Sequence, residues 1–238
     1  MNRSLAIVNS WYHSNKLILN INKTMYVTFG NRNDSLPQNL TIHLDNHLLN
    51  RVQSTSYMGV IFDQNIKWKE HVKSIYKRTR YLIYIFSRLK NILSFNNLIS
   101  AYFAFFHSIA TYGIIAWGSA YGNSKNLLLN LQEKLYNIVR NKNSKNNSIL
   151  NINQTYIYKS IISEYQCLKD KYLNSNSKTR NKNLIFPEIR LNIGKMNHIF
   201  TATKIYNKLP HILKTLDIKK KSSKKIIKEW ILKSGVQL

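Results

Sequence analysis

The chain has 238 residues, 44% of them hydrophobic, so it is long enough and apolar enough to bury a substantial core. Lysine and arginine number 36 against 10 aspartate and glutamate, a formal net charge of +26 that favours a polyanionic partner, either nucleic acid or an anionic membrane surface. The single cysteine, Cys167, excludes an internal disulfide and a cysteine-rich zinc site.

The first quarter of the chain mixes helical and strand-like patterns. Ser4 to Lys16 carries apolar residues at helical spacing, which predicts a helix. Short apolar or alternating runs, separated by polar turn residues, predict strands at Leu17–Asn22, Met25–Phe29, Thr41–Asp45 and Ser54–Phe62. The turns are expected at residues 30–34 and 46–47.

From Lys69 onward the pattern is helical. One helix is predicted over Lys69–Lys90, where apolar residues form a stripe and the cations lie largely off it. Further helices are predicted over Asn97–Trp117, Lys125–Arg140 and Asn153–Leu173, and a last amphipathic helix contains Ile226–Ile231. Polar, basic linkers are expected at Asn141–Asn147 and Asn174–Asn183.

These patterns predict an α+β protein in three parts. Residues 1–66 form a short mixed α/β region with a helix, short antiparallel strands and a tight turn. Residues 67–173 form a mainly α-helical domain, and residues 174–238 form a basic C-terminal extension that ends in a helix.

Four short segments in a fixed order resemble a known family. Together they resemble the C-terminal part of the reverse transcriptases of non-LTR (LINE-like, jockey-type) retrotransposons, from the end of the palm through the thumb and the region after it. The resemblance extends from about Leu5 to Trp230, and its middle, Asn141–Lys182, is matched only by helical character. The segments are Leu17-Ile18-Leu19-Asn20-Ile21-Asn22-Lys23-Thr24, Tyr57-Met58-Gly59-Val60-Ile61-Phe62-Asp63, Tyr112-Gly113-Ile114-Ile115-Ala116-Trp117-Gly118 and Ile205-Tyr206-Asn207-Lys208-Leu209-Pro210.

The resemblance implies a polymerase whose metal-binding aspartates lie before this sequence begins. That family's catalytic aromatic-Ala-Asp-Asp segment precedes its Leu-Asn-x-x-Lys-Thr element, so we expect no catalytic residue, metal site or cofactor in this chain. Mg²⁺ is implied for the full-length enzyme, which carries out templated nucleotidyl transfer. The partners implied are RNA, DNA or an RNA–DNA hybrid, together with the missing N-terminal polymerase portion, and the chain alone is expected not to extend a primer.

Two palm positions carry over from the resemblance. Lys23 lies in the element that follows the catalytic aspartates and is a candidate contact to the phosphates of a nucleotide, although an exposed strand lysine is the simpler interpretation. Tyr57, Met58 and Gly59 match the turn that grips the primer end, with Met58 where leucine is usual. Asp63, which follows them, is expected to be a core or capping residue rather than a metal ligand.

The predicted helix over Lys69–Lys90 is the candidate thumb surface. Its cations suit phosphates and its interleaved tyrosines suit stacking on bases, but a solvated charged face over an apolar stripe has the same pattern. The candidate nucleic-acid contacts are Lys73, Lys77, Arg78, Arg80 and Tyr81.

The remaining motifs favour structure over chemistry. Tyr112 to Gly118 is expected to pack aromatic side chains at a helix end, with Gly118 as its cap. No role follows for residues 203–210. Residues 219–225 are either a basic localisation or phosphate-contact patch or a solvated run in which Ser222 or Ser223 caps the last helix.

Two other functions fit parts of the sequence. One is a non-enzymatic, basic nucleic-acid-binding protein derived from such an element. The other is a small membrane protein that uses residues 98–118, an uncharged run of the length that spans a bilayer. Polar residues such as His107 within that run favour a buried helix instead. We therefore expect no membrane partner and, without a signal peptide, a nuclear or cytoplasmic protein that is not secreted.

Overall fold

The described residues form an α+β fold that is mainly helical with a few short strands. In this computed structural model they are residues 2–30, 40–44, 47–120, 122–140, 149–174, 183–188 and 197–235. They divide into two compact units, residues 1–71 and residues 72–238. The predicted linker residues 141–147 and 175–182 lie outside the described residues.

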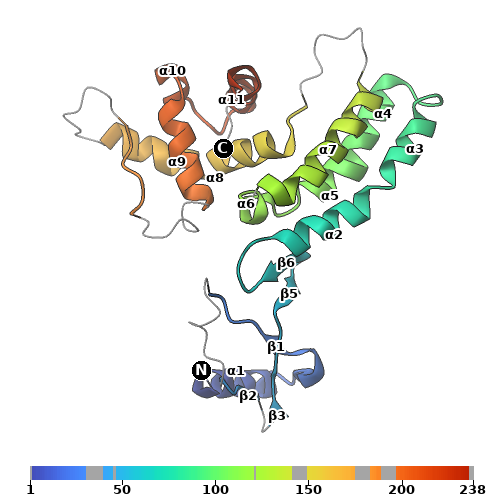
Figure 1. The fold of residues 1–238 in the computed structure, drawn as a ribbon. Coiled ribbons are helices and arrows are strands. Elements are labelled where there is room, and N and C mark those ends of the chain that lie inside the picture. Colours follow the sequence, from blue (N-terminus) through green and yellow to red (C-terminus); the bar gives the residue numbers. More distant parts are fainter. Residues whose placement is uncertain are drawn as a thin grey trace. The chain divides into compact units, whose positions relative to one another are not determined.

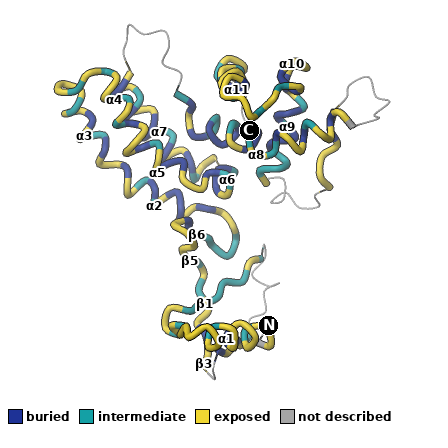
Figure 2. Tube along the Cα trace, turned by 180° about the vertical axis from the view of Figure 1, so that it is seen from behind, coloured by how far each residue is buried: buried dark blue, intermediate teal, exposed yellow. Residues whose placement is uncertain are grey.

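The first unit begins with α1 (Asn2–Ser14), which contacts strand β2 (His43–Leu44). Its sheets each have two strands: β1 (Met25–Tyr26) runs parallel to β4 (Asn50–Arg51), and β2 is antiparallel to β3 (His47–Leu48). A small core joins them, built on Ile42, Leu44 and Leu49. Figure 2 shows that most of α1 is exposed.

The helix predicted over Ser4–Lys16 is confirmed, and the strand predicted over Leu17–Asn22 is wrong. Residues 17–20 are irregular, and η1 (Ile21–Lys23) is a 3₁₀ turn. The side chain of Asn20 accepts a hydrogen bond from Lys23 N at 3.1 Å, and this local bond competes with strand pairing. The strand predicted over Met25–Phe29 contains only the two residues of β1.

The single strand predicted over Ser54–Phe62 is instead a β-hairpin. Strands β5 (Ser54–Tyr57) and β6 (Val60–Asp63) pair antiparallel, with Tyr57 opposite Val60. The two turn residues between them both have positive φ, 48° at Met58 and 77° at Gly59. Two such residues match the twist of a two-residue hairpin loop, and glycine adopts that conformation without strain.

The helix predicted over Lys69–Lys90 is two helices, α2 (Lys69–Thr79) and α3 (Leu82–Leu89). Thr79 Oγ1 donates back to Ile75 O at 2.8 Å, and the chain turns at Arg80 and Tyr81. Such back-bonding at a helix end is a local alternative to continuing the helix.

The helix predicted over Asn97–Trp117 is also interrupted. It consists of α4 (Phe95–Ala101), a π-helical turn η3 (Tyr102–His107), α5 (Ser108–Ala110) and α6 (Ile114–Trp117). Gly113, with φ of 60°, separates α5 from α6 because a left-handed residue cannot continue a helix. Among the residues that the structure describes, no helix combines the length and apolar character that crossing a bilayer requires.

The longest helices organise the second unit. Helix α7 (Gly122–Val139) contacts α3 and α4. Helix α8 (Ile152–Asn174) contacts α6 and two helices of the C-terminal region, which are α9 (His198–Lys208) and α11 (Lys221–Ser234). The short α10 (His211–Lys214) follows α9, and Figure 1 shows α9 and α10 beside α8. The helices predicted over Lys125–Arg140 and Asn153–Leu173, and the last helix, are confirmed.

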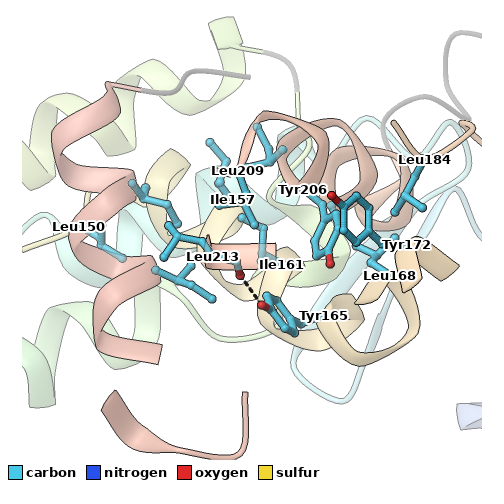
Figure 3. Close-up of a cluster of buried hydrophobic side chains, with 14 residues drawn as sticks. Leu150, Ile157, Ile161, Tyr165, Leu168, Tyr172, Leu184, Tyr206, Leu209 and Leu213 are labelled. Carbon is cyan, nitrogen blue, oxygen red and sulfur yellow. Dashed lines mark hydrogen bonds between the residues drawn. The ribbon is translucent and has the colours of Figure 1, made fainter. Parts of the chain in front are cut away.

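A buried cluster joins α8 to the C-terminal helices (Figure 3). Tyr165 and Tyr206 meet edge to face with ring centroids 5.7 Å apart, and both are fully buried. Their hydroxyls donate to backbone carbonyls, Tyr165 to Leu213 O and Tyr206 to Lys214 O at 2.8 Å. Buried side chains of α8, α9, α10 and α11 therefore share one core.

Two predicted caps differ from the structure. Gly118 is the C-cap of α6 with its N–H donating to Ile114 O, as expected, but its φ is −63° rather than left-handed. A Cβ there would lie 2.6 Å from Tyr156 Cγ, so close packing rather than backbone freedom requires glycine. The N-cap of α11 is Lys220 without a side-chain bond, so neither Ser222 nor Ser223 caps that helix, and Ser223 is buried inside it.

Candidate nucleic-acid interface

A continuous buried stripe fixes which side chains of α2 and α3 face outward. The buried positions follow the spacing 3, 4, 3, 4, which keeps the same helical phase across the break at residues 80–81. They are Val72, Ile75, Thr79, Leu82 and Phe86.

The exposed side of these two helices is basic and aromatic. We call it the α2–α3 surface and define it as Lys73, Lys77, Arg78, Arg80, Tyr81, Tyr84 and Arg88, all of which are exposed. Tyr81 is 55% exposed and Tyr84 is 67% exposed, which are high values for tyrosines and leave their rings accessible for stacking. Arg88 lies over the ring of Tyr84, 5.5 Å from its centroid, so one cation and one aromatic face form a unit.

The cations of the α2–α3 surface are not neutralised by described carboxylates. The ion pairs among the described residues are His198 with Glu164 and Lys225 with Glu229, both elsewhere. Glu70 lies in the first turn of α2, and Lys77 and Arg78 lie in its last turn, an arrangement that suits the helix dipole. Five cations on two adjoining helices therefore remain available to phosphates.

The structure brings the five predicted contacts Lys73, Lys77, Arg78, Arg80 and Tyr81 together on this surface. The other predicted positions belong to the first unit. Lys23 is exposed at the end of η1, where its backbone N–H donates to Asn20.

The predicted primer-grip residues form the tip of the β5–β6 hairpin. Tyr57 is 63% exposed and Met58 is 73% exposed. The Tyr57 ring meets Phe62 at 6.5 Å between centroids, and Phe62 meets the buried Trp68 at 5.1 Å. The tip thus projects outward while its base is anchored by aromatic packing.

Asp63 holds the segment between the hairpin and α2. Its Oδ1 accepts from Asn65 N at 3.1 Å and Lys67 N at 3.0 Å, and its Oδ2 accepts from Trp68 N at 2.7 Å. These bonds support two left-handed residues, Ile66 with φ of 53° and Trp68 with φ of 62°, each costing about 1–2 kcal/mol. Asp63 therefore has a structural role in this loop, but the N–H groups that it binds precede α2, so it does not cap that helix.

The described residues do not fit a Mg²⁺ site. The oxygens of Asp63 already accept three backbone N–H groups, and no three His, Cys, Asp or Glu side chains converge among the described residues. Two-metal phosphoryl transfer needs converging carboxylates.

Sequence reasoning missed the second anchor of the hairpin. The buried His71, in the first turn of α2, accepts a hydrogen bond at Nδ1 from Ile61 N at 3.2 Å. The only sequence signal for this contact was the close spacing of a histidine to the strand.

Comparisons of the chain with protein-family models, with curated proteins and with solved structures find no match.

Proposed function

We propose that this chain is the nucleic-acid-binding C-terminal part of a reverse transcriptase of the non-LTR retrotransposon class. In this proposal residues 1–66 are the end of the palm, residues 67–173 are the thumb and residues 174–238 are an extension beyond it. The observation that carries the proposal is the α2–α3 surface, where five exposed cations and two exposed tyrosines lie over a buried stripe.

The chemistry of this surface favours nucleic acid over other polyanions. Cations neutralise phosphates and release counterions, which supplies sequence-independent affinity. Exposed tyrosines add stacking on bases, a contact that a lipid headgroup or an acidic peptide does not offer. The net charge of +26 acts in the same direction through long-range attraction.

The palm positions have supporting roles in the proposal. The exposed hairpin tip at Tyr57, Met58 and Gly59 contacts the primer strand, and Lys23 faces a nucleotide phosphate. In this proposal the chain binds nucleic acid and does not polymerise. A primer-extension assay with an annealed RNA template and Mg²⁺ is expected to give no product, and template-dependent incorporation would contradict this part.

The binding proposal is tested by salt-dependent titration of a labelled single strand and a labelled RNA–DNA hybrid. The variant Lys73→Ala/Lys77→Ala/Arg78→Ala removes three cations from the surface. From about 50 to about 200 mM salt, its slope of log K against log salt is expected to be shallower than that of the unmodified chain by about 2–3.

A matched control separates a localised surface from general basicity. The variant Lys134→Ala/Lys171→Ala/Lys233→Ala removes the same charge from exposed positions of α7, α8 and α11. It is expected to retain most of the slope. Equal losses in the two variants would mean that binding is spread over the whole charge of the chain, and this result would overturn the assignment to α2 and α3.

A further inference from the structure

A pocket of about 370 Å³ lies between α7 and the start of α8. Helix α7 contributes Asn130, Glu133 and Tyr136 to it, and the start of α8 contributes Asn151, Asn153 and Gln154. Helix α7 also contacts α3, so one helix carries both this pocket and part of the support for the α2–α3 surface.

The walls of the pocket are held in place by hydrogen bonds. Buried Gln132 donates to Tyr102 OH at 3.0 Å and to Leu150 O at 3.1 Å, and it accepts from Ile152 N at 2.9 Å. Asn151 and Gln154 cap α8 reciprocally: each side-chain oxygen accepts from the other residue's N–H, at 2.8 and 3.0 Å. This is the capping-box arrangement, and it makes the site rigid before any ligand arrives.

The polar groups that remain in the pocket are neutral donors and acceptors plus one carboxylate. The capping bonds use the oxygens of Asn151 and Gln154, and their NH₂ groups make no hydrogen bond to a described residue. Asn153 Oδ1 is buried and has no hydrogen-bond partner among the described residues. This oxygen is closed off from the pocket, so the polar groups available to a ligand are the two amide NH₂ groups and the carboxylate of Glu133.

The pocket is also unusual for this chain because none of the described residues that line it is a lysine or arginine. In a chain with 36 cations, these described lining residues favour a ligand by hydrogen bonding rather than by attraction to phosphate. Amide NH₂ donors, acceptor oxygens, a carboxylate and a tyrosine match the edge and face of a nucleobase.

We propose that this pocket binds an unpaired cytosine. The carboxylate of Glu133 accepts from its exocyclic amino group, and the amide NH₂ groups of Asn151 and Gln154 donate to its ring nitrogen and its carbonyl oxygen. Uracil has a carbonyl oxygen in place of the amino group, so it faces the carboxylate with a second acceptor. The inference rests on the proposed function, since the base belongs to a strand whose phosphates the cations hold.

The test compares cytidine and uridine oligoribonucleotides of equal length, which have the same backbone and ring size and differ only in their pairing edge. The unmodified chain is expected to bind the cytidine strand about fivefold or more tightly. In Glu133→Gln this ratio is expected to approach one, because glutamine also donates to the uracil carbonyl. Glu133 is exposed, so the isosteric change leaves the fold intact.

Glu229→Gln on α11 is the matched control, since it makes the same charge change away from the pocket at an exposed position. It is expected to keep the cytidine preference. A ratio near one in the unmodified chain, or an unchanged ratio in Glu133→Gln, would overturn the pocket assignment while leaving electrostatic binding intact. Failure to bind either strand would overturn the proposed function and this inference with it.

Discussion

The two compact units of the chain both expose apolar side chains but differ in what fills their cores. In residues 1–71 Ile18 is 89% exposed and Met58 is 73% exposed, and in residues 72–238 Ile185 is 94% exposed. The largest fully buried side chains of residues 72–238 are aromatic, namely Trp117, Tyr102, Tyr156, Tyr165, Tyr206, Phe86 and Phe106, whereas the largest of the described residues 1–71 is Ile42.

This difference shows that the units keep their shape by different means. The first unit has sheets of only two strands, which are marginal alone. It depends on bonds from side chains to backbone, such as those of Asn20, Asp63 and His71. The second unit relies on a close-packed aromatic core. This core offsets the free-energy cost of locally unfavourable interactions, which the first unit does not tolerate. Amide hydrogen exchange is therefore expected to be faster in residues 1–71.

The largest expected change of stability with pH concerns a lysine buried in the well-packed unit. Lys125 is 3% exposed on the buried face of α7, and its Nζ donates to Gly118 O at 2.8 Å. Burial lowers the pKa of this amine from 10.5 to about 8. Below pH 8 the folded protein carries the cost of a buried charge, on the order of 3 kcal/mol at most, and stability is regained as pH rises from about 8 toward 10.5.

Lys125→Met removes this cost together with one hydrogen bond of about 1 kcal/mol. The variant is expected to be up to about 2 kcal/mol more stable than the unmodified chain near neutral pH. The difference should shrink between pH 8 and 10.5, as measured by urea unfolding across that range. Lys134→Met, exposed on the same helix, should stay within about 0.5 kcal/mol. A difference that is constant with pH would show that the Lys125 amine titrates as a solvated lysine.

A second effect tests how tightly the same core is packed. At Gly118 an added Cβ would meet Tyr156 Cγ at 2.6 Å and Ile114 O at 2.5 Å, so either a buried ring or the helix backbone must shift. Gly118→Ala is expected to cost about 1–3 kcal/mol. Hydrogen exchange should locate the loss in amides of α6 and α8, with residues 1–71 unaffected.

Gly122→Ala is the matched control for that substitution. Gly122 begins α7, and nothing lies within 4 Å of an added Cβ. Alanine there should be neutral or stabilising by up to about 1 kcal/mol, because it reduces the freedom of the unfolded chain. Equal effects of the two substitutions would mean that the core around Tyr156 is looser than the structure has it.

The long periodic helices were predictable because their apolar spacing agrees with their packing. The spacing in α7 also indicated that Lys125 is buried. This lysine lies three residues before Leu128 and seven before Gln132, on the buried stripe. Charge alone suggested that this lysine is exposed. The capping box of α8 was likewise visible as Asn151 followed three residues later by Gln154, but the pocket beside it depends on two helices meeting.

The short elements were not predictable because single side chains decide them. An apolar run at residues 17–22 has the composition of a strand, yet the bond from Asn20 turns it into a 3₁₀ turn. The apolar stripe of Lys69–Lys90 continues through the break between α2 and α3, so periodicity could not reveal that break. The candidate contacts on α2 were found from charge and spacing, and their role in binding stays a prediction.

The smallest expected effect tests the first unit at its hairpin tip. Met58 adopts φ of 48° in a two-residue turn that strongly favours asparagine followed by glycine. Met58→Asn is expected to stabilise the β5–β6 hairpin by about 0.5–1 kcal/mol, because asparagine tolerates the left-handed region better than methionine. Slower amide exchange of the paired residues 54–63 would measure the gain.

Gly59→Ala should act in the opposite direction, because its φ of 77° strains any residue with a Cβ.

The pair of variants also separates the stability of the hairpin from nucleic-acid binding at its tip. If the Met58 side chain grips a strand, Met58→Asn weakens nucleic-acid binding while it stabilises the hairpin. If affinity instead follows hairpin stability, rising in Met58→Asn and falling in Gly59→Ala, the turn conformation rather than the methionine carries the contact. Unchanged exchange in both variants would mean that the hairpin is held by Asp63 and His71 at its base and that its turn contributes little.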